Sequence, residues 1–164
     1  MCNLWLTLFL EVLNMNVARK SKPQTSRAAD FALPDQFQNT HALKFPRDKV
    51  CVLVFGDRQG AEHLQAWIEP IYYKFPDQID IYGVAELSAV PTLVRPLVRQ
   101  MVKSRTKYAV LLDWTGRIAQ SYAYEAGQAL LVVIDKVGNI VTRKTGTANQ
   151  KDLNNIYRQI TKAL

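Results

Sequence analysis

KVCVLVFGDRQGAEHLQAWIEPIYYK, residues 49–74, is the stretch that decides the fold. Its first eight residues, 49–56, are almost continuously apolar and rich in β-branched side chains, which is typical of a strand buried on both faces of a sheet. The polar residues 57–60, DRQG, then interrupt the run. From there to about Lys74, apolar residues recur at three- and four-residue spacing, which predicts an amphipathic helix; they are Leu64, Trp67, Ile68 and Ile71.

The rest of the chain alternates between strand and helix patterns in the same way. The predicted elements are a short edge hairpin over 31–35 and 41–45, a strand over 79–84, a helix from Pro91 to about Ser104, a strand over 108–112, a central strand over 129–134, its hairpin partner over 139–144 and a closing helix over about 149–163. This order predicts an α/β domain in which a central mixed β-sheet is flanked by helices on both faces.

Several turns and aromatic residues add local detail to this pattern. Asp113 and Asp135 both begin D-x-x-G turns, in which the carboxylate caps the backbone and the glycine supplies a permissive φ. For residues 135–138 we expect a two-residue loop within the second hairpin. Trp114, Tyr122 and Tyr124 follow one another after the third strand, and we expect them to pack across neighbouring strands.

Three different motifs stand at the start, in the middle and at the end of the domain. FALPD, residues 31–35, has the pattern F-x-L-P-D, and residues 49–56 follow as the buried strand. LLDWTGRIAQSYAYEAGQALLVVIDKVGNIV, residues 111–141, closes with a hairpin of the pattern ID-x-x-G-x-I. In this order the motifs resemble the thioredoxin-like superfamily, in particular its redoxin and alkyl-hydroperoxide-reductase-like branch. The resemblance runs from about Phe31 to Ile160 and implies a thioredoxin-like fold.

The residues that carry the chemistry of that superfamily are missing here. Its active members have a cysteine just after the buried strand, where the N-terminus of the first helix stabilises a thiolate. The corresponding residues 57–62, DRQGAE, contain no cysteine, serine or threonine. A cis-proline facing the cysteine is the second hallmark, and residues 127–129, GQA, stand in its place. The chain is similar to bacterial thioredoxin-fold proteins that lack catalytic cysteines, which implies a degenerate member without thiol redox activity.

The two cysteines of the chain offer no other route to thiol or metal chemistry. Cys2 precedes the domain, and Cys51 lies inside the buried strand, where apolar surroundings raise the pKa of a thiol and make it inert. His41 and His63 are the only histidines, so we expect neither a metal site nor a cofactor. So few cysteines fit a reducing compartment, which predicts a cytoplasmic protein and leaves export open.

Polar residues gather where the active site of the superfamily would stand. One interpretation is an anion or peptide site, since a helix N-terminus with an added arginine attracts a carboxylate or phosphate. The other is ordinary capping, in which the Asp57 side chain satisfies free backbone N–H groups and His63 faces solvent. The candidate residues are Asp57, Arg58, Gln59, Gly60 and His63, with Gln128 and Ala129 facing them from the later strand.

The net charge of +7 favours acidic partners. One local concentration of basic residues lies on the helix predicted after Pro91, where apolar residues form another face. This basic face could dock an acidic protein or membrane headgroups, or it could simply be solvated. The absence of an RNP-like aromatic pattern or a zinc finger argues against nucleic acid. The basic face consists of Arg95, Arg99 and Lys103, continued by Arg105 and Lys107; the apolar face consists of Leu93, Leu97, Val98, Met101 and Val102.

Residues 1–29 are predicted to be an apolar and basic leader and linker, flexible over 15–29, and residues 30–164 to be the domain. LWLTLFLEVL, residues 4–13, is shorter than the roughly 20 apolar residues that span a bilayer. It also lacks the preceding basic residue of a signal peptide. Three interpretations remain: a peripheral membrane anchor, a helix that packs on the domain, or an upstream extension not made in the cell. Met15, which opens a polar stretch, favours the third.

The sequence thus predicts a non-catalytic thioredoxin-fold domain. We expect it to bind a protein or peptide, acidic in character, through the face on which its relatives carry their active site. The alternative is a redoxin-class, peroxiredoxin-like oxidoreductase that uses an unconventional set of residues.

Overall fold

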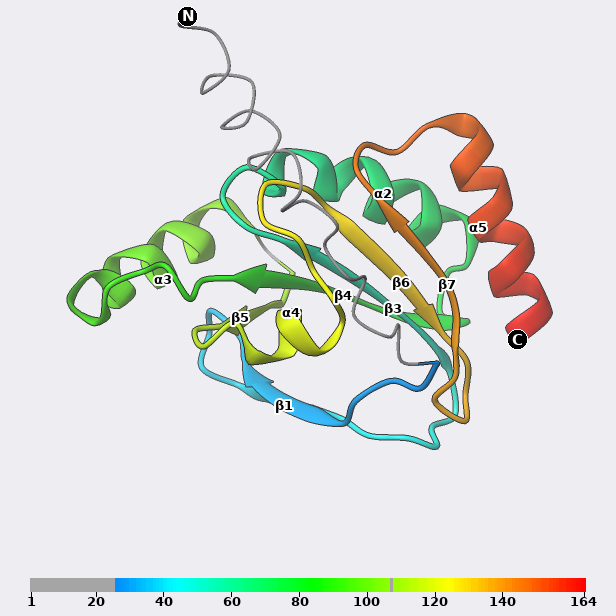
Figure 1. Cartoon of the computed structure of the whole chain (residues 1–164), viewed down its shortest axis with the longest axis horizontal. Coiled ribbons are helices and arrows are strands. Elements are labelled where there is room, and N and C mark those ends of the chain that lie inside the picture. Colours follow the sequence, from blue (N-terminus) through cyan, green and yellow to red (C-terminus); the bar gives the residue numbers. More distant parts are fainter. Residues whose placement is uncertain (1–25, 107) are drawn as a thin grey trace, which may run out of the picture.

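The computed structural model describes residues 26–106 and 108–164. A five-stranded mixed sheet with the strand order β5-β4-β3-β6-β7 forms its centre, and a two-stranded antiparallel sheet, β1-β2, lies beside it (Figure 1). The strands are β1 (Phe31–Pro34), β2 (Thr40–Leu43), β3 (Val50–Gly56), β4 (Ile79–Glu86), β5 (Val110–Asp113), β6 (Leu130–Ile134) and β7 (Ile140–Thr145). The helices are α2 (Ala61–Lys74), the short 3₁₀ helix η1 (Thr92–Val94), α3 (Arg95–Arg105), α4 (Arg117–Ser121) and α5 (Gln150–Ala163).

The central strand is β3, as the sequence predicts. It runs parallel to β4 and antiparallel to β6, and all of its residues are buried. Because side chains alternate along a strand, Val52 and Val54 belong to the core on one face, while Leu53 and Phe55 belong to the core on the other. A strand that is covered on both faces requires a continuously apolar sequence, and this is what residues 50–55 supply.

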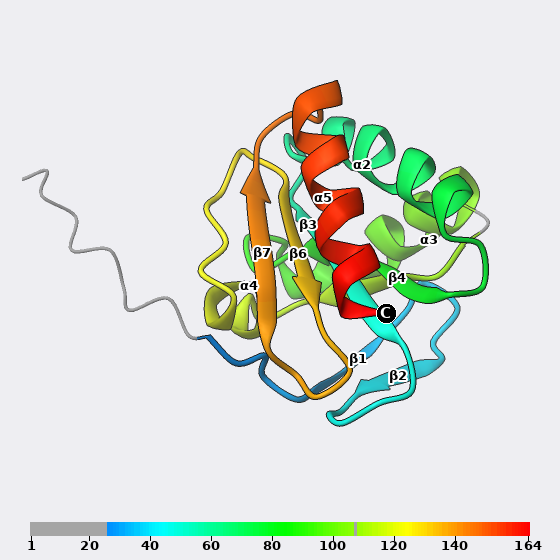
Figure 2. The ribbon, with the colours of Figure 1, turned by 90° about the vertical axis from the view of Figure 1, so that its right-hand side faces the viewer.

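Helices α2 and α5 cover one face of the sheet (Figure 2). Trp67 and Ile71 of α2 are buried there together with Ile156 and Ile160 of α5. Trp67 also donates a hydrogen bond from Nε1 to the carbonyl oxygen of Gly146, at 2.8 Å. The large indole ring therefore fills the core while its polar atom is satisfied, and it ties α2 to the segment between β7 and α5.

The β1-β2 hairpin and α4 cover the opposite face, where Phe31, Ala119 and Tyr122 are buried. The sequence did not predict α4, which is only five residues long and therefore too short to show a helical period. A side chain from the preceding strand holds it: the carboxylate of Asp113 accepts from the N–H groups of Ile118 and Ala119, both at 2.9 Å. The predicted capping role of Asp113 is confirmed.

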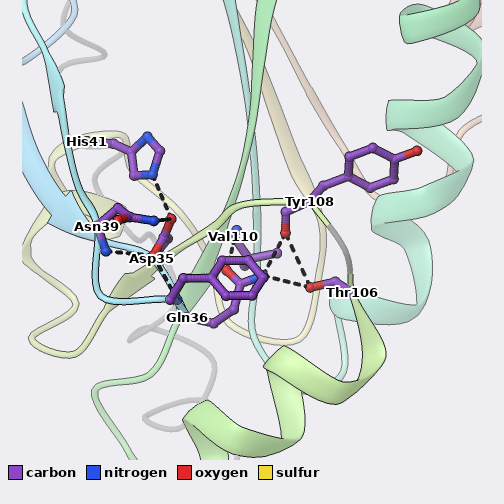
Figure 3. A network of polar contacts seen from close by, with 8 residues as sticks. Asp35, Gln36, Asn39, His41, Thr106, Tyr108 and Val110 are labelled. Atoms are coloured by element: carbon purple, nitrogen blue, oxygen red, sulfur yellow. Dashed lines mark hydrogen bonds and ion pairs between the residues drawn. The ribbon is translucent and has the colours of Figure 1, made fainter.

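Two buried polar residues, Asp35 and Gln36, attach the hairpin to the edge of the sheet (Figure 3). Gln36 donates from Nε2 to the carbonyl oxygen of Tyr108, at 2.7 Å, and its Oε1 accepts from the N–H of Val110, at 2.8 Å. One carboxylate oxygen of Asp35 lies 2.8 Å from Nε2 of His41. Since a buried polar group must find partners, the Gln36 amide fixes the hairpin against the start of β5, while the Asp35 carboxylate holds the turn of the hairpin itself.

Residues 26–29, which the sequence assigns to a flexible linker, already pack on the domain. Ala28 is buried and donates from its N–H to the carbonyl oxygen of Gly138, at 2.8 Å. The N–H of Ile140 donates to the carbonyl oxygen of Ser26, at the same distance. The expectation of a flexible linker is therefore wrong for these four residues, because the β6-β7 hairpin offers them backbone partners. The rest of the leader, including residues 4–13, lies outside the described residues.

The predicted two-residue loop between β6 and β7 is also wrong. The N–H of Asp135 donates to the carbonyl oxygen of Asn139, at 3.0 Å, which leaves residues 136–138 in the loop. Gly138 adopts a φ of 99°, and the carboxylate of Asp135 accepts from the N–H of Asn139, at 2.7 Å. The carboxylate and the left-handed glycine together favour the longer loop, a common arrangement in hairpins.

Candidate functional site

Asp57 stands at the carboxyl end of β3 and joins two distant segments of the chain. Its Oδ1 accepts from the N–H groups of Gln59, at 2.9 Å, and Gly60, at 2.8 Å, in the turn that begins α2. Its Oδ2 accepts from the N–H of Gly127, at 2.6 Å, in the loop before β6. One carboxylate thus links the end of the central strand, the start of the first long helix and the loop that faces it.

These hydrogen bonds also determine the charge of the group. Burial alone would raise the pKa of Asp57, but the hydrogen bonds from Gly60, Gly127 and Gln59 outweigh it and hold the pKa below its usual value. Because α2 presents the positive end of its dipole here, the anion is further favoured. At neutral pH the start of α2 therefore holds a negative charge that belongs to the chain itself.

Tyr124 closes the same site from the side of α4. Its hydroxyl accepts from the N–H of Asp57, at 2.8 Å, and donates to the carbonyl oxygen of Gln128, at 2.9 Å. Burial raises the pKa of this hydroxyl to about 12, so it stays a donor at neutral pH. The expected packing of Tyr122 and Tyr124 across strands is wrong, because both follow α4 and meet Phe55 of the central strand from that side.

The loop before β6 lies directly on the start of α2. A Cβ atom built on Gly60 would stand 2.2 Å from the carbonyl oxygen of Gln128, so only glycine permits this approach. Gly127 has a φ of 84°, a conformation that likewise favours glycine. The backbone of residues 127–128 therefore covers the centre of the candidate site.

The remaining predicted site residues lie around the backbone of residues 127–128 or beneath it. We call the exposed residues around it the rim of the site. The side chains of Arg58, Gln59 and Gln128 are exposed around the covered centre. His63 is half-buried, with Nδ1 at 3.3 Å from the hydroxyl of Thr147, so it turns towards the segment before α5. Ala129 is fully buried in the core. The structure thus brings Asp57, Gln59, Gly60 and Gln128 together, and it shows the capping arrangement for Asp57.

Part of the basic face of α3 packs on the domain: Arg95 and Arg99 are half-buried, whereas Lys103 and Arg105 are exposed. The guanidinium groups of Arg95 and Arg99 lie 5.3 Å and 5.9 Å from the centre of the Trp114 ring, and Arg95 also donates to the carbonyl oxygen of Trp114, at 3.3 Å. Nζ of Lys103 lies 5.7 Å from the ring of Phe37. Cations stack favourably on aromatic faces, and the long stems of arginine cover apolar surface, so the side of α3 that carries Arg95 and Arg99 packs on Trp114.

As a consequence, much of the apolar face of α3 points outward. Leu93 is 94% exposed, Leu97 71% and Met101 43%, and no described residue of α3 is buried. These three residues, spaced by four, form a line along the outside of η1 and α3 that we call the α3 ridge. The predicted apolar face is divided in the structure, since Val98 and Val102 are half-buried, and the period of a sequence does not state which side of a helix meets the body of the protein.

Cys51 is the cysteine within the described residues, and it is fully buried. Burial raises the pKa of its thiol to about 12. The prediction of a buried thiol is confirmed. Among residues 26–106 and 108–164, no group of three or more histidine, cysteine, aspartate or glutamate side chains could hold a metal ion. Across those same residues, no helix has the length and apolar character that crossing a bilayer requires.

Solved structures share this architecture over almost the whole domain. A protein from Chlorobium tepidum assigned as the thiol:disulfide interchange protein DsbE aligns with a TM-score of 0.66 at 20% identity, covering 87% of this chain and 99% of that chain. The chain has a thioredoxin-like fold. The fold implied by the sequence motifs is therefore confirmed, with its mixed five-stranded sheet and flanking helices.

Two further solved structures have a similar TM-score. One, from Bacteroides thetaiotaomicron, is assigned as a protein disulfide isomerase and has a TM-score of 0.65 at 25% identity, covering 85% of this chain and 88% of that one. The other is the exposed lipoprotein thioredoxin of Streptococcus pneumoniae, with a TM-score of 0.65 at 20% identity, covering 82% and 99%. No protein-family model matches the sequence, and no curated protein matches it.

Asp57→Asn should destabilise the folded protein by about 1–2 kcal/mol at pH 7. An amide keeps one acceptor oxygen for the turn before α2, but its NH₂ group would meet the N–H of Gly127, donor against donor. Urea unfolding followed by circular dichroism measures the loss.

The difference between Asp57→Asn and the wild type should shrink in acid. Because the folded protein lowers the pKa of Asp57, the stabilisation by its carboxylate is complete above the unfolded pKa of about 4 and is lost as the pH falls through the folded value. Asp48→Asn, at an exposed carboxyl group, serves as the control and should change stability little. A deficit in Asp57→Asn that stays constant from neutral pH into the acid range would contradict this account.

Proposed function

We propose that this chain is a thioredoxin-fold binding protein that performs no thiol-disulfide chemistry. The observation that carries the proposal is the state of the turn before α2. Residues 57–62 contain no cysteine, and the N–H groups that would stabilise a thiolate there are bonded to the carboxylate of Asp57. The three solved structures with the same fold are named as a thiol:disulfide interchange protein, a protein disulfide isomerase and a thioredoxin. This chain has the fold of those proteins but no cysteine in residues 57–62.

Cys51 offers no substitute for the missing group. Thiol-disulfide exchange needs a thiolate that a substrate can reach. Because burial raises the pKa of the Cys51 thiol to about 12, the thiol stays protonated at pH 7. The side chain is also fully buried between the layers of the domain. Both requirements therefore fail at this residue.

A binding role fits the exposed rim of the site. The Arg58 guanidinium can pair with a carboxylate, and the amides of Gln59 and Gln128 can each donate to and accept from a peptide backbone. Thioredoxin folds commonly hold extended chains beside the loop before the strand that β6 represents. The overall charge of +7 adds a long-range attraction for acidic chains. We therefore infer that the ligand is an extended acidic peptide segment of a protein partner.

The thiol part of the proposal predicts no reduction of insulin disulfides and no hydroperoxide turnover with dithiothreitol as the reductant. It also predicts that iodoacetamide leaves Cys51 unmodified in the native protein and modifies it in guanidinium chloride, as followed by mass spectrometry of the peptide that contains this residue. Turnover that disappears in Cys51→Ser would overturn the proposal in favour of a redoxin-class enzyme with an unconventional site.

The binding part predicts that acidic peptides shift the backbone amide resonances of residues 58–59 and 127–128 in ¹⁵N-labelled protein. Basic peptides of the same length should not. Arg58→Glu should weaken this binding by about tenfold or more, since it replaces an attraction by a repulsion. Arg158→Glu, on the exposed side of α5, changes the net charge equally and is the matched control. An equal loss in both variants would show that only net charge matters and would contradict the assigned site.

A further inference from the structure

The α3 ridge is an apolar surface that nothing in the described part of the chain covers. Leu93, Leu97 and Met101 follow one another along the outside of a helix that stands at one end of the molecule (Figure 1). Tyr108, just beyond the helix, is also mostly exposed. Exposed apolar residues that adjoin one another, rather than being scattered singly, mark a surface that binds a protein or a membrane.

Charge is distributed unevenly around this ridge. From residue 87 to residue 112 the chain has five basic residues and no carboxylate: Arg95, Arg99, Lys103, Arg105 and Lys107. Lys103 and Arg105 are exposed. At 100° per residue, they fall on either side of Leu97 on the helix, so cations flank the apolar line. The surface thus combines exposed leucines with positive charge and has no negative charge of its own.

We propose that the α3 ridge docks on the surface of an anionic phospholipid bilayer. An amphipathic helix that lies in a membrane interface places its leucines at the boundary of the acyl chains, while flanking lysines and arginines extend to the headgroups. A tyrosine at the end of the helix suits the interface, where aromatic side chains with a polar group gather. The α3 ridge is straight and is flanked by cations, so it can lie flat on an anionic surface.

A second feature of the sequence favours a bilayer over an acidic protein. Residues 4–13 are another apolar run, followed by Arg19, Lys20 and Lys22, and a peripheral membrane anchor is one of the three interpretations that remain open for it. Stable attachment to a membrane generally takes two separate weak signals. The chain has two segments of the required composition, separated by about 80 residues. The proposal concerns a surface that is separate from Asp57 and its neighbours, so it does not depend on the proposed peptide binding.

Sedimentation of the full chain with phospholipid vesicles tests the proposal. We expect binding to vesicles of phosphatidylcholine with about one third phosphatidylglycerol, and binding at least about tenfold weaker to phosphatidylcholine alone. Leu93→Gln/Leu97→Gln should reduce binding to the anionic vesicles by about tenfold or more, because it removes the apolar side chains that enter the bilayer on binding. The matched control is Tyr72→Gln/Tyr73→Gln, which removes two exposed aromatic residues from α2 and should leave binding unchanged.

Three results would overturn the proposal. One is binding to anionic vesicles that Leu93→Gln/Leu97→Gln leaves intact. Another is concentration-dependent dimerisation of the wild type that this variant abolishes, with no binding to vesicles, which would make the ridge a contact between two copies of the chain. The third is binding to soluble polyglutamate without binding to vesicles, which would indicate an acidic protein. Both variants change exposed side chains, so circular dichroism should show unaltered folding.

Discussion

The carboxylate of Asp57 is the interaction on which the candidate site depends. It accepts three backbone N–H groups from segments that lie about seventy residues apart in the chain, and it does so at the end of the central strand. The turn before α2 and the loop before β6 are therefore held by the same group. The close approach of Gly60 to the carbonyl of Gln128 follows from this, since the two backbones meet where the carboxylate draws them together.

The same physical feature that activates a thiol elsewhere in this fold serves a structural purpose here. A helix N-terminus stabilises an anion, whether the anion is a thiolate that reacts or a carboxylate that does not. In this chain the anion is an aspartate whose pKa is lowered, so it stays charged and bonded at neutral pH. The positive end of α2 is thereby used for stability, and the peptide binding that we propose is left to the exposed side chains around it.

Strand and helix patterns in the sequence were sufficient for the architecture, because β3 and β6 are buried on both faces and read as unbroken apolar runs. Capping by Asp57 and Asp113 was also open to prediction, since both act on residues a few positions away. The bond from Gly127 to Asp57 and the two bonds of Tyr124 join residues far apart in the chain, which no local pattern reveals. The orientation of α3 depends on Trp114, whose ring attracts the arginines and turns the leucines outward.

The ionisation of a cysteine placed at the start of α2 tests most directly whether Asp57 has taken the position of the thiolate. In Gln59→Cys, the pH dependence of alkylation should give the introduced thiol a pKa at or above the ordinary value of about 8.5. In Gln59→Cys/Asp57→Ala the N–H groups of the turn lose the carboxylate as their acceptor, and the pKa should fall by about one unit or more. Gln65→Cys, inside α2, should respond little to Asp57→Ala. A pKa well below 8.5 in Gln59→Cys, with Asp57 still present, would contradict the account.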